Sequence, residues 1–374
     1  MQLKPFRLDA WLDQYEHGIE FNLAASTGPA WTVNDVLALA DEETRHRFLS
    51  HKLVYSRPAG ADSLREAIAE MQGVPVEAVQ IVTGASEALV ALMWLSAEPG
   101  ANVILPLPGF PTFSALPESL GLETRFYRVR PENGFRIDPD EIRRLADAKT
   151  KLILINSPHN PTGATIGDEE MEALDDFSAE RGIRLVSDEV YHPIYHGTQT
   201  QSAARLPHVT VISDLSKAFA MAGVRTGWMI EHDARRRQQY WNARAYFSIS
   251  NTTTGEILSE IAIRERDVVL GKTQAIATRN LKLLERFLAD HSDVLGWIPP
   301  EGGMTAFPWL VSGEHERPFC QAATEHGILL APGDCFDMPS HFRLGFAAAG
   351  EEFPKALDRF GAFVKSWSAR MVGA

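Results

Sequence analysis

The chain has 374 residues, 45% of them hydrophobic and 23% charged, a composition typical of globular proteins. Its net charge of −13 at pH 7 argues against a nucleic-acid backbone or an anionic membrane surface as partner. The two cysteines, Cys320 and Cys335, exclude a disulfide framework and lack metal-ligand spacing, so we expect no metal site.

The N-terminal residues lack the apolar segment of a signal peptide, and no run of about 18 apolar residues occurs. From these features we expect a cytoplasmic protein. The length is sufficient for one large domain and a smaller one.

Short apolar strands alternate with amphipathic helices from residue 79 onward. Before them lie an irregular arm with a predicted helix over 33–48, a loop that contains Tyr55, and a helix over 63–72. The predicted strands cover 79–82, 102–106, 124–129, 151–156, 183–187, 209–212 and 226–230. Helices are predicted over 86–97, 138–146 and 168–181. This alternation predicts an α/β fold with a mostly parallel sheet covered by helices.

The remainder of the chain is predicted to form a long helix over 271–291 and short strands over 304–310 and 342–345. We therefore expect a large domain over 48–275. A smaller α+β domain would combine the N-terminal arm, 1–47, with the C-terminal part, 276–374.

Segments of possible chemical importance follow several of the predicted strands, where ligands bind in parallel sheets. Gly84, Ala85 and Ser86 follow the first strand and begin a helix whose free N–H groups could bind an anion, although Ser86 as an ordinary N-cap explains the pattern equally well. Phe110 follows the second strand in a loop stiffened by Pro and Gly, and could stack on a planar ring or pack in the core.

Asn160 lies in an Asn-Pro-Thr-Gly turn after the fourth strand, and Asp188 follows the fifth. A carboxylate at a strand end is commonly a structural cap, but it could also bind a protonated ring nitrogen. Asn160, Asp188 and Lys217 are spaced by about one strand–helix–strand unit each. We therefore expect all three to meet along one edge of the sheet.

Lys217 follows the sixth strand in an apolar stretch whose only other charged residues, between 209 and 230, are Asp214 and Arg225. Most lysines are solvated surface residues. Burial lowers the pKa of an ammonium group, however, and the free amine is a nucleophile suited to a Schiff base with an aldehyde.

Six segments together resemble one enzyme family: TGASEAL (83–89), PGFPTF (108–113), NSPHNPTG (156–163), SDEVY (187–191), SDLSKAFAMAGVRTGW (213–228) and FRLGF (342–346). In order and spacing they resemble the class I/II aminotransferases of pyridoxal-phosphate fold type I. This resemblance implies a large domain with a seven-stranded sheet, the cofactor pyridoxal 5'-phosphate, and a transferase of amino acid metabolism that acts on amino acids and keto acids.

The resemblance also implies roles for individual residues. Lys217 would form the Schiff base and act as general acid and base, and Asp188 would pair with the pyridine nitrogen. Asn160 and Tyr191 would bind the phenolic oxygen of the ring, and Phe110 would stack on its face. The phosphate would be held by Gly84, Ala85, Ser86, Ser216 and Arg225.

Three further matches concern the substrate and the assembly. Arg343, together with Asn160, matches the residues that bind the substrate, with the arginine on its α-carboxylate. Gly28 lies where the N-terminal arm lines that pocket. Tyr55 matches a tyrosine that reaches the phosphate of a neighbouring subunit, which implies a homodimer with shared active sites.

One residue departs from the family pattern. The position three before the lysine is commonly Ser, Thr or Gly, but here it is Asp214, whose carboxylate would repel a phosphate. Either Asp214 turns away and Ser213 or Ser216 binds the phosphate, or the local match is displaced by one residue.

The resemblance leaves the reaction open, because the same core residues support several chemistries. An aminotransferase is our first interpretation. The chain also resembles a subgroup that includes capreomycidine synthase, so the alternative is a cyclase or lyase acting on a hydroxyarginine-like amino acid. A guanidinium substrate would need a carboxylate, which the acidic arm could supply or which could simply be solvated: Asp9, Asp13, Glu16 and Glu20. A non-enzymatic regulator of this fold would carry an additional DNA-binding domain, for which we expect no room.

Overall fold

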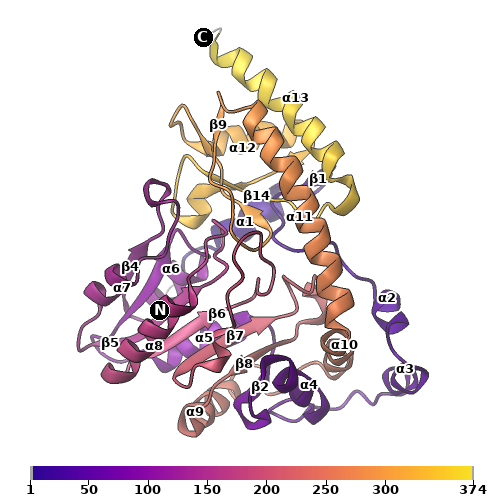
Figure 1. Cartoon of the computed structure of the whole chain (residues 1–374), viewed down its shortest axis with the longest axis vertical. Helices are drawn as coiled ribbons and strands as arrows, with labels where there is room; N and C mark the ends of the chain where they lie inside the picture. Colours follow the sequence, from indigo (N-terminus) through magenta and orange to yellow (C-terminus); the bar gives the residue numbers. More distant parts are fainter. Residues whose placement is uncertain (1–2, 373–374) are drawn as a thin grey trace.

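The computed structural model describes residues 3–372 and is built around a seven-stranded sheet (Figure 1). From one edge to the other, the strands are β2 (Val79–Val82), β8 (Gly227–Ile230), β7 (Val209–Asp214), β6 (Arg184–Asp188), β5 (Thr150–Asn156), β3 (Asn102–Leu107) and β4 (Glu123–Arg128). All seven predicted strands are present, and the predicted α/β class with a mostly parallel sheet is confirmed.

The sheet is parallel from β4 to β7, whereas β8 pairs antiparallel with both β7 and β2. Every residue of β6 and β7 is buried, as expected for central strands covered on both faces, although each strand carries three polar residues. Because parallel strands end at the same edge, the ends of β5, β6 and β7 lie side by side, with Asn156 opposite Asp188 in the register.

Thirteen helices lie in the described part of the chain: α1 (Arg7–Tyr15), α2 (Val33–Ala38), α3 (Glu42–Leu49), α4 (Asp62–Gln72), α5 (Ala85–Leu95), α6 (Thr112–Ser119), α7 (Pro139–Leu145), α8 (Asp168–Arg181), α9 (Ala234–Arg244), α10 (Thr253–Arg264), α11 (Arg266–Asp290), α12 (Glu316–Glu325) and α13 (Phe353–Val372). None of these helices has both the length and the apolar character needed to cross a membrane.

Three sequence predictions of elements need correction. The helix expected over 33–48 is two helices, because Asp41 caps a new helix by accepting a hydrogen bond from the Thr44 N–H at 2.8 Å. The helix expected from residue 271 begins at Arg266 and passes through Gly271. The strand expected over 304–310 is interrupted at Phe307 and Pro308, since proline cannot donate a ladder hydrogen bond.

Shorter strands form three small sheets away from the large one: β1 (Phe21–Asn22) with β12 (Ile328–Leu329); β10 (Thr305–Ala306) with β14 (Phe342–Gly345) and β13 (Ala331–Pro332); and β9 (Leu295–Gly296) with β11 (Trp309–Leu310). Helix α11 runs from beside the large sheet to this smaller part, where α12 and α13 lie (Figure 1). The expected domain boundary at residue 275 falls inside α11, and the division of the chain at that residue stays a prediction.

The N-terminal arm joins both parts of the molecule. Its strand β1 pairs with β12, and Trp11 donates a hydrogen bond from Nε1 to the Leu330 carbonyl at 2.8 Å. Helix α2, farther along the arm, packs instead against α10. The arm therefore passes across the carboxyl edge of the large sheet on its way between the two parts.

A buried ion pair anchors helix α5, which begins at this edge. The Arg244 Nε atom lies 2.9 Å from the Glu87 Oε1 atom, and both side chains are almost fully buried. Arg244 also donates to the Pro58 carbonyl and to Asn251 Oδ1. The pair thus ties α5 to α9 and to the loop before α4.

We predict that Arg244→Ala lowers the free energy of unfolding by about 3–5 kcal/mol, because it leaves the Glu87 carboxylate buried and unpaired. The matched control is Arg143→Ala, which breaks a solvent-exposed pair with Asp140 and should cost less than about 1 kcal/mol. Urea denaturation of the three proteins measures both changes. Equal losses in the two variants would contradict the prediction.

Candidate active site

The polar residues at the ends of β5, β6 and β7 line one cavity of about 200 Å³. Its lining includes most of the residues expected at the cofactor site: Ala85, Ser86, Phe110, Asn160, Asp188, Tyr191, Ser216, Lys217 and Arg225. It also includes Asn156 and Asp214. Segments that are far apart in the sequence therefore meet where strand-end reasoning predicts that they should.

Lys217 is half-buried, just beyond β7, and its Nζ atom donates a hydrogen bond to Ser26 Oγ at 2.9 Å. Ser26 is buried and belongs to the N-terminal arm. Sequence reasoning missed Ser26, because its partner lies 191 residues away and nothing local marks the serine. The arm thus reaches the amine of the candidate catalytic lysine directly.

Asp188 is the last residue of β6, and its carboxyl group is buried with few hydrogen bonds to offset the loss of water. Its Oδ1 atom accepts one long hydrogen bond, from the Val190 N–H at 3.3 Å. Burial raises the pKa of Asp188 to about 7, and the nearby carboxylates of Asp214 and Glu189 add to this shift while Lys217 opposes it. A carboxyl group in this position can bind a cation that enters the cavity.

Asn156, Asn160 and Arg343 form a connected polar network beside Asp188. Asn156 donates from Nδ2 to the Asp188 carbonyl at 3.1 Å and accepts from the Asn160 N–H at 2.8 Å. Asn160 Oδ1 in turn accepts from Arg343 Nη1 at 3.2 Å. Asn156 was not singled out from the sequence, although the strand-end rule that identified Asp188 applies equally to it.

Arg343 lies on β14, in the smaller part of the molecule, and is buried. Its Nη2 atom donates to the Ala24 carbonyl of the arm at 2.6 Å, whereas its Nε–H has no hydrogen-bond partner among residues 3–372. Burial lowers the pKa of Arg343. A buried guanidinium with a free N–H is suited to binding a carboxylate.

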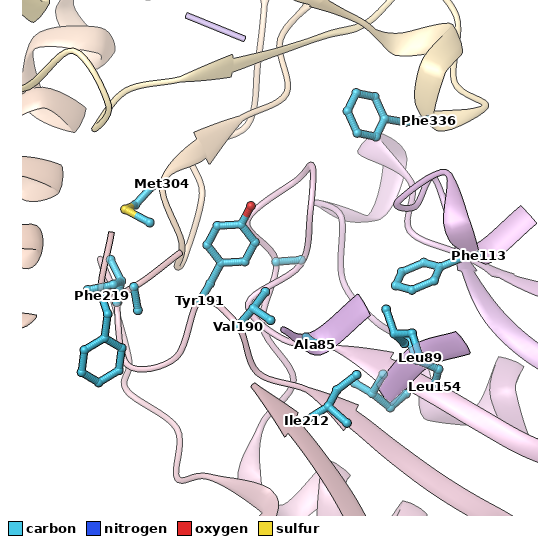
Figure 2. Close-up of a cluster of buried hydrophobic side chains, with 14 of the residues drawn as sticks. Ala85, Leu89, Phe113, Leu154, Val190, Tyr191, Ile212, Phe219, Met304 and Phe336 are labelled. Carbon is cyan, nitrogen blue, oxygen red and sulfur yellow. The ribbon is translucent and has the colours of Figure 1, made fainter. Parts of the chain in front are cut away.

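Tyr191 contributes another buried donor without a partner. Its side chain is 1% exposed and its hydroxyl makes no hydrogen bond within the described residues. Figure 2 shows the ring beside Val190, with the hydroxyl pointing away from Ile212 and the sheet. Buried hydroxyl groups are normally hydrogen-bonded, so this one is available to a ligand.

The start of α5 and Arg225 form the part of the cavity expected to hold a phosphate. Gly84 has φ of 73°, and a Cβ atom at this position would lie 2.6 Å from Arg225 Nη2. The positive φ favours glycine here, and a side chain at this position would also require the end of the flexible Arg225 side chain to move. Arg225 Nη1 also lies 3.5 Å from Ser216 Oγ.

Asp214 does not turn away from this region. Its Oδ2 atom accepts a hydrogen bond from the Ala85 N–H at 3.1 Å, and its Oδ1 atom accepts one from the Ser216 N–H at 2.8 Å. Ser213 instead faces the opposite side of the sheet, where its hydroxyl donates to the Glu189 carbonyl at 3.1 Å. The first alternative drawn from the sequence is therefore wrong for Asp214 and for Ser213.

Several other expected residues lie outside the cavity lining. Tyr55 is 80% exposed. Gly28 lies against Ala220 and Thr273, and a Cβ atom at this glycine would meet them at 3.0 and 3.1 Å. The acidic residues of the arm are on the solvent-exposed surface: Asp9, Asp13, Glu16 and Glu20.

The residues of the cavity fit pyridoxal phosphate. Within the described part of the chain the buried Asp188 carboxyl has no ion-pair partner and the Tyr191 hydroxyl has no hydrogen-bond partner, so a protonated ring nitrogen and an oxygen of the ring could bind to them. Lys217 provides the amine that an aldehyde requires.

Comparisons with known proteins agree with this fit. The family model for class I and II aminotransferases matches residues 22–360. The chain is 31% identical over 340 residues to aspartate/prephenate aminotransferase of Thermus thermophilus, covering 85% of each chain. It is 26% identical over 356 residues to capreomycidine synthase of Streptomyces vinaceus, covering 94% of this chain and 91% of that one. A crystal structure of a PLP-dependent aminotransferase from Streptococcus suis superposes with a TM-score of 0.91 at 26% identity, covering 98% of this chain and 99% of that one.

The raised pKa of Asp188 predicts how the stability of the cofactor-free protein depends on pH. Because the pKa is about 7 when folded and has an ordinary value of 3.8, the folded state binds the proton more tightly. The resulting stabilisation is present at low pH and is lost as the pH rises through this window.

Asp188→Asn cannot titrate at this position. We therefore expect the stability of this variant, relative to the unmodified protein, to increase as the pH rises from about 5 to about 8. Urea denaturation at the two pH values measures the difference. Parallel pH profiles for the two proteins would show that Asp188 does not titrate in this range.

Proposed function

The chain belongs to the class I and II aminotransferase family and is a pyridoxal-phosphate-dependent enzyme, and we propose that it transfers the amino group of an α-amino acid with Lys217 as the reacting amine. One observation carries the proposal. The amine of Lys217, the buried carboxyl of Asp188 and the amide of Asn160 line a single cavity at the carboxyl edge of the sheet.

When bound, pyridoxal phosphate would supply a ring that accepts the electrons of the bond broken at the substrate Cα atom. In our assignment, Asp188 binds the protonated ring nitrogen, Asn160 and Tyr191 bind the phenolic oxygen, and Phe110 packs on the ring face. The phosphate would be bound by the residues around the start of α5: Gly84, Ala85, Ser86, Ser216 and Arg225.

The chain's own residues would act on the substrate as follows. Arg343 binds the α-carboxylate, since its guanidinium is buried, has a free N–H and is oriented by Asn160 and the Ala24 carbonyl. Lys217 takes the proton from the substrate Cα atom. Ser26 holds the Nζ atom of Lys217 in one direction by accepting its hydrogen bond. Gly28 lets the arm approach Ala220 and Thr273 closely, which fixes the path of the arm past the substrate.

The similarity to capreomycidine synthase favours a second candidate, in which a hydroxyarginine-like amino acid undergoes elimination or cyclisation. Both reactions begin when Lys217 removes the Cα proton, and they diverge in whether a group then leaves from Cβ. The exposed carboxylates of the arm are not part of the cavity lining. The two carboxylates that do line it are Asp188 and Asp214.

We also propose a homodimer with shared active sites. Large apolar side chains are exposed close together in the chain: Leu49, Leu53, Val54 and Tyr55. Exposed apolar side chains grouped in this way are typical of an interface between subunits. In such a dimer Tyr55 would reach the phosphate site of the partner subunit. A cytoplasmic location stays a prediction from the sequence.

The two reactions differ in their stoichiometry when an amino acid is supplied without a keto acid. An aminotransferase should form about one equivalent of keto acid per subunit and then stop until an acceptor such as pyruvate is added. We expect this result for at least one neutral or basic amino acid. Chromatography of the products measures it.

The control for this experiment uses two lysine variants. Lys217→Ala should form no product, whereas Lys151→Ala, which removes a surface lysine paired with Glu98 on the same sheet, should behave normally. Continuous product formation from a hydroxyarginine without an acceptor would replace the aminotransferase proposal with the cyclase.

For the assembly, we expect Leu53→Asp to shift the protein toward monomers and to weaken cofactor binding by about tenfold or more, because a buried unpaired charge opposes association. Leu53 is 85% exposed in the single chain, so folding of the subunit should be unaffected. Val311→Asp, at another exposed apolar residue, is the control. Sedimentation measures the oligomeric state of both variants, and titration measures their affinity for the cofactor. A Leu53→Asp variant that is dimeric and binds the cofactor with normal affinity would refute the shared site.

A further inference from the structure

Asp214 places a second anion in the region assigned to the cofactor phosphate. The carboxylate is 6% exposed and lines the cavity. It accepts hydrogen bonds from the Ala85 N–H, at the start of α5, and from the Ser216 N–H. Backbone N–H groups at the start of a helix are the donors that a phosphate uses, so Asp214 already occupies one of them.

The nearby cation makes no direct ion pair with this carboxylate among the described residues. Arg225 directs its Nη1 atom to Ser216 Oγ and to the Ala222 carbonyl, and no ion pair joins it to Asp214 within the described residues. The negative charge of Asp214 also acts on the opposite side of the cavity, because its repulsion is one of the causes that raise the pKa of Asp188. A phosphate bound here would therefore compete with Asp214 for the same N–H donors. It would also be repelled by the negative charge of Asp214 at close range.

On the basis of the proposed function, we propose that Asp214 competes with the cofactor phosphate for the Ala85 N–H and so determines how strongly the chain selects the phosphorylated cofactor. The protein then holds the cofactor chiefly through Lys217 and the residues around the ring. The phosphate contributes less than it would if serine, threonine or glycine stood at residue 214.

A purely structural role makes a different prediction. If Asp214 only fixes the loop between β7 and Lys217, its replacement should weaken the binding of every ligand of the cavity equally. If it competes with the phosphate, its replacement should strengthen the binding of phosphorylated ligands alone. The comparison of pyridoxal phosphate with pyridoxal, which lacks the phosphate, separates the two cases.

The experiment titrates the cofactor-free full chain with each compound by absorbance and compares the two dissociation constants. In Asp214→Ser and Asp214→Asn, we expect the preference for pyridoxal phosphate over pyridoxal to rise by about tenfold or more, the effect of restoring one hydrogen bond to a charged group. Calorimetry with inorganic phosphate should show tighter binding to the same variants. Two variants are used because the asparagine retains an acceptor for the Ser216 N–H if the serine variant folds poorly.

Asp147→Asn is the matched control. Asp147 also accepts the N–H of the residue two positions later, from Lys149 at 2.8 Å, but it is not part of the cavity lining. The preference of the Asp147→Asn variant for pyridoxal phosphate over pyridoxal should equal that of the unmodified protein. An unchanged or reduced preference in both Asp214 variants would overturn the inference. Failure of the unmodified protein to bind either compound would instead overturn the proposed function.

Discussion

The arrangement of the site depends on one geometric constraint, the alternation of side chains at the ends of neighbouring parallel strands. Successive residues of a strand face opposite sides of the sheet. At the end of β6 this alternation directs Asp188 into the candidate site and Glu189 to the other side, and at the end of β7 it does the same for Asp214 and Ser213. The other side holds a separate cavity lined in part by Glu189 and Ser213. Asp188 and Asp214 thus face the same cavity because the register pairs Asp188 with Ile212, two residues before Asp214.

The rest of the site comes from segments that close over this edge. The Gly345 N–H on β14 donates to the Leu23 carbonyl of the arm at 2.7 Å, and a Cβ atom at Gly345 would collide with the Ala25 carbonyl oxygen. This close packing places the Ala24 carbonyl against Arg343 and carries Ser26 to Lys217. The positions of Arg343, proposed to bind the substrate carboxylate, and of the acceptor for the lysine amine therefore depend on the same contact between the arm and β14.

The sequence was sufficient to predict the features that depend on local patterns. Apolar runs revealed the seven strands, and polar residues at their ends identified Asp188, Asn160 and Lys217. Helix α6 escaped notice because Pro117 lies within it and obscures the helical pattern. Ser26 and the direction of Asp214 could not be predicted, since each depends on packing between segments that are distant in the sequence. Tyr55 is exposed in the single chain, and its contact with a partner subunit stays a proposal.

The strict register of β7 also affects how this enzyme can evolve. A deletion or insertion of one residue before Asp214 would exchange its orientation with that of Ser213, turning the carboxylate to the back of the sheet and disturbing Lys217 at the same time. A base change in the codon is far less disruptive, because aspartate and asparagine codons differ at one position. Under the competition proposed for Asp214, a point mutation can adjust the binding of the cofactor phosphate, whereas a change in the length of this strand would also move Lys217.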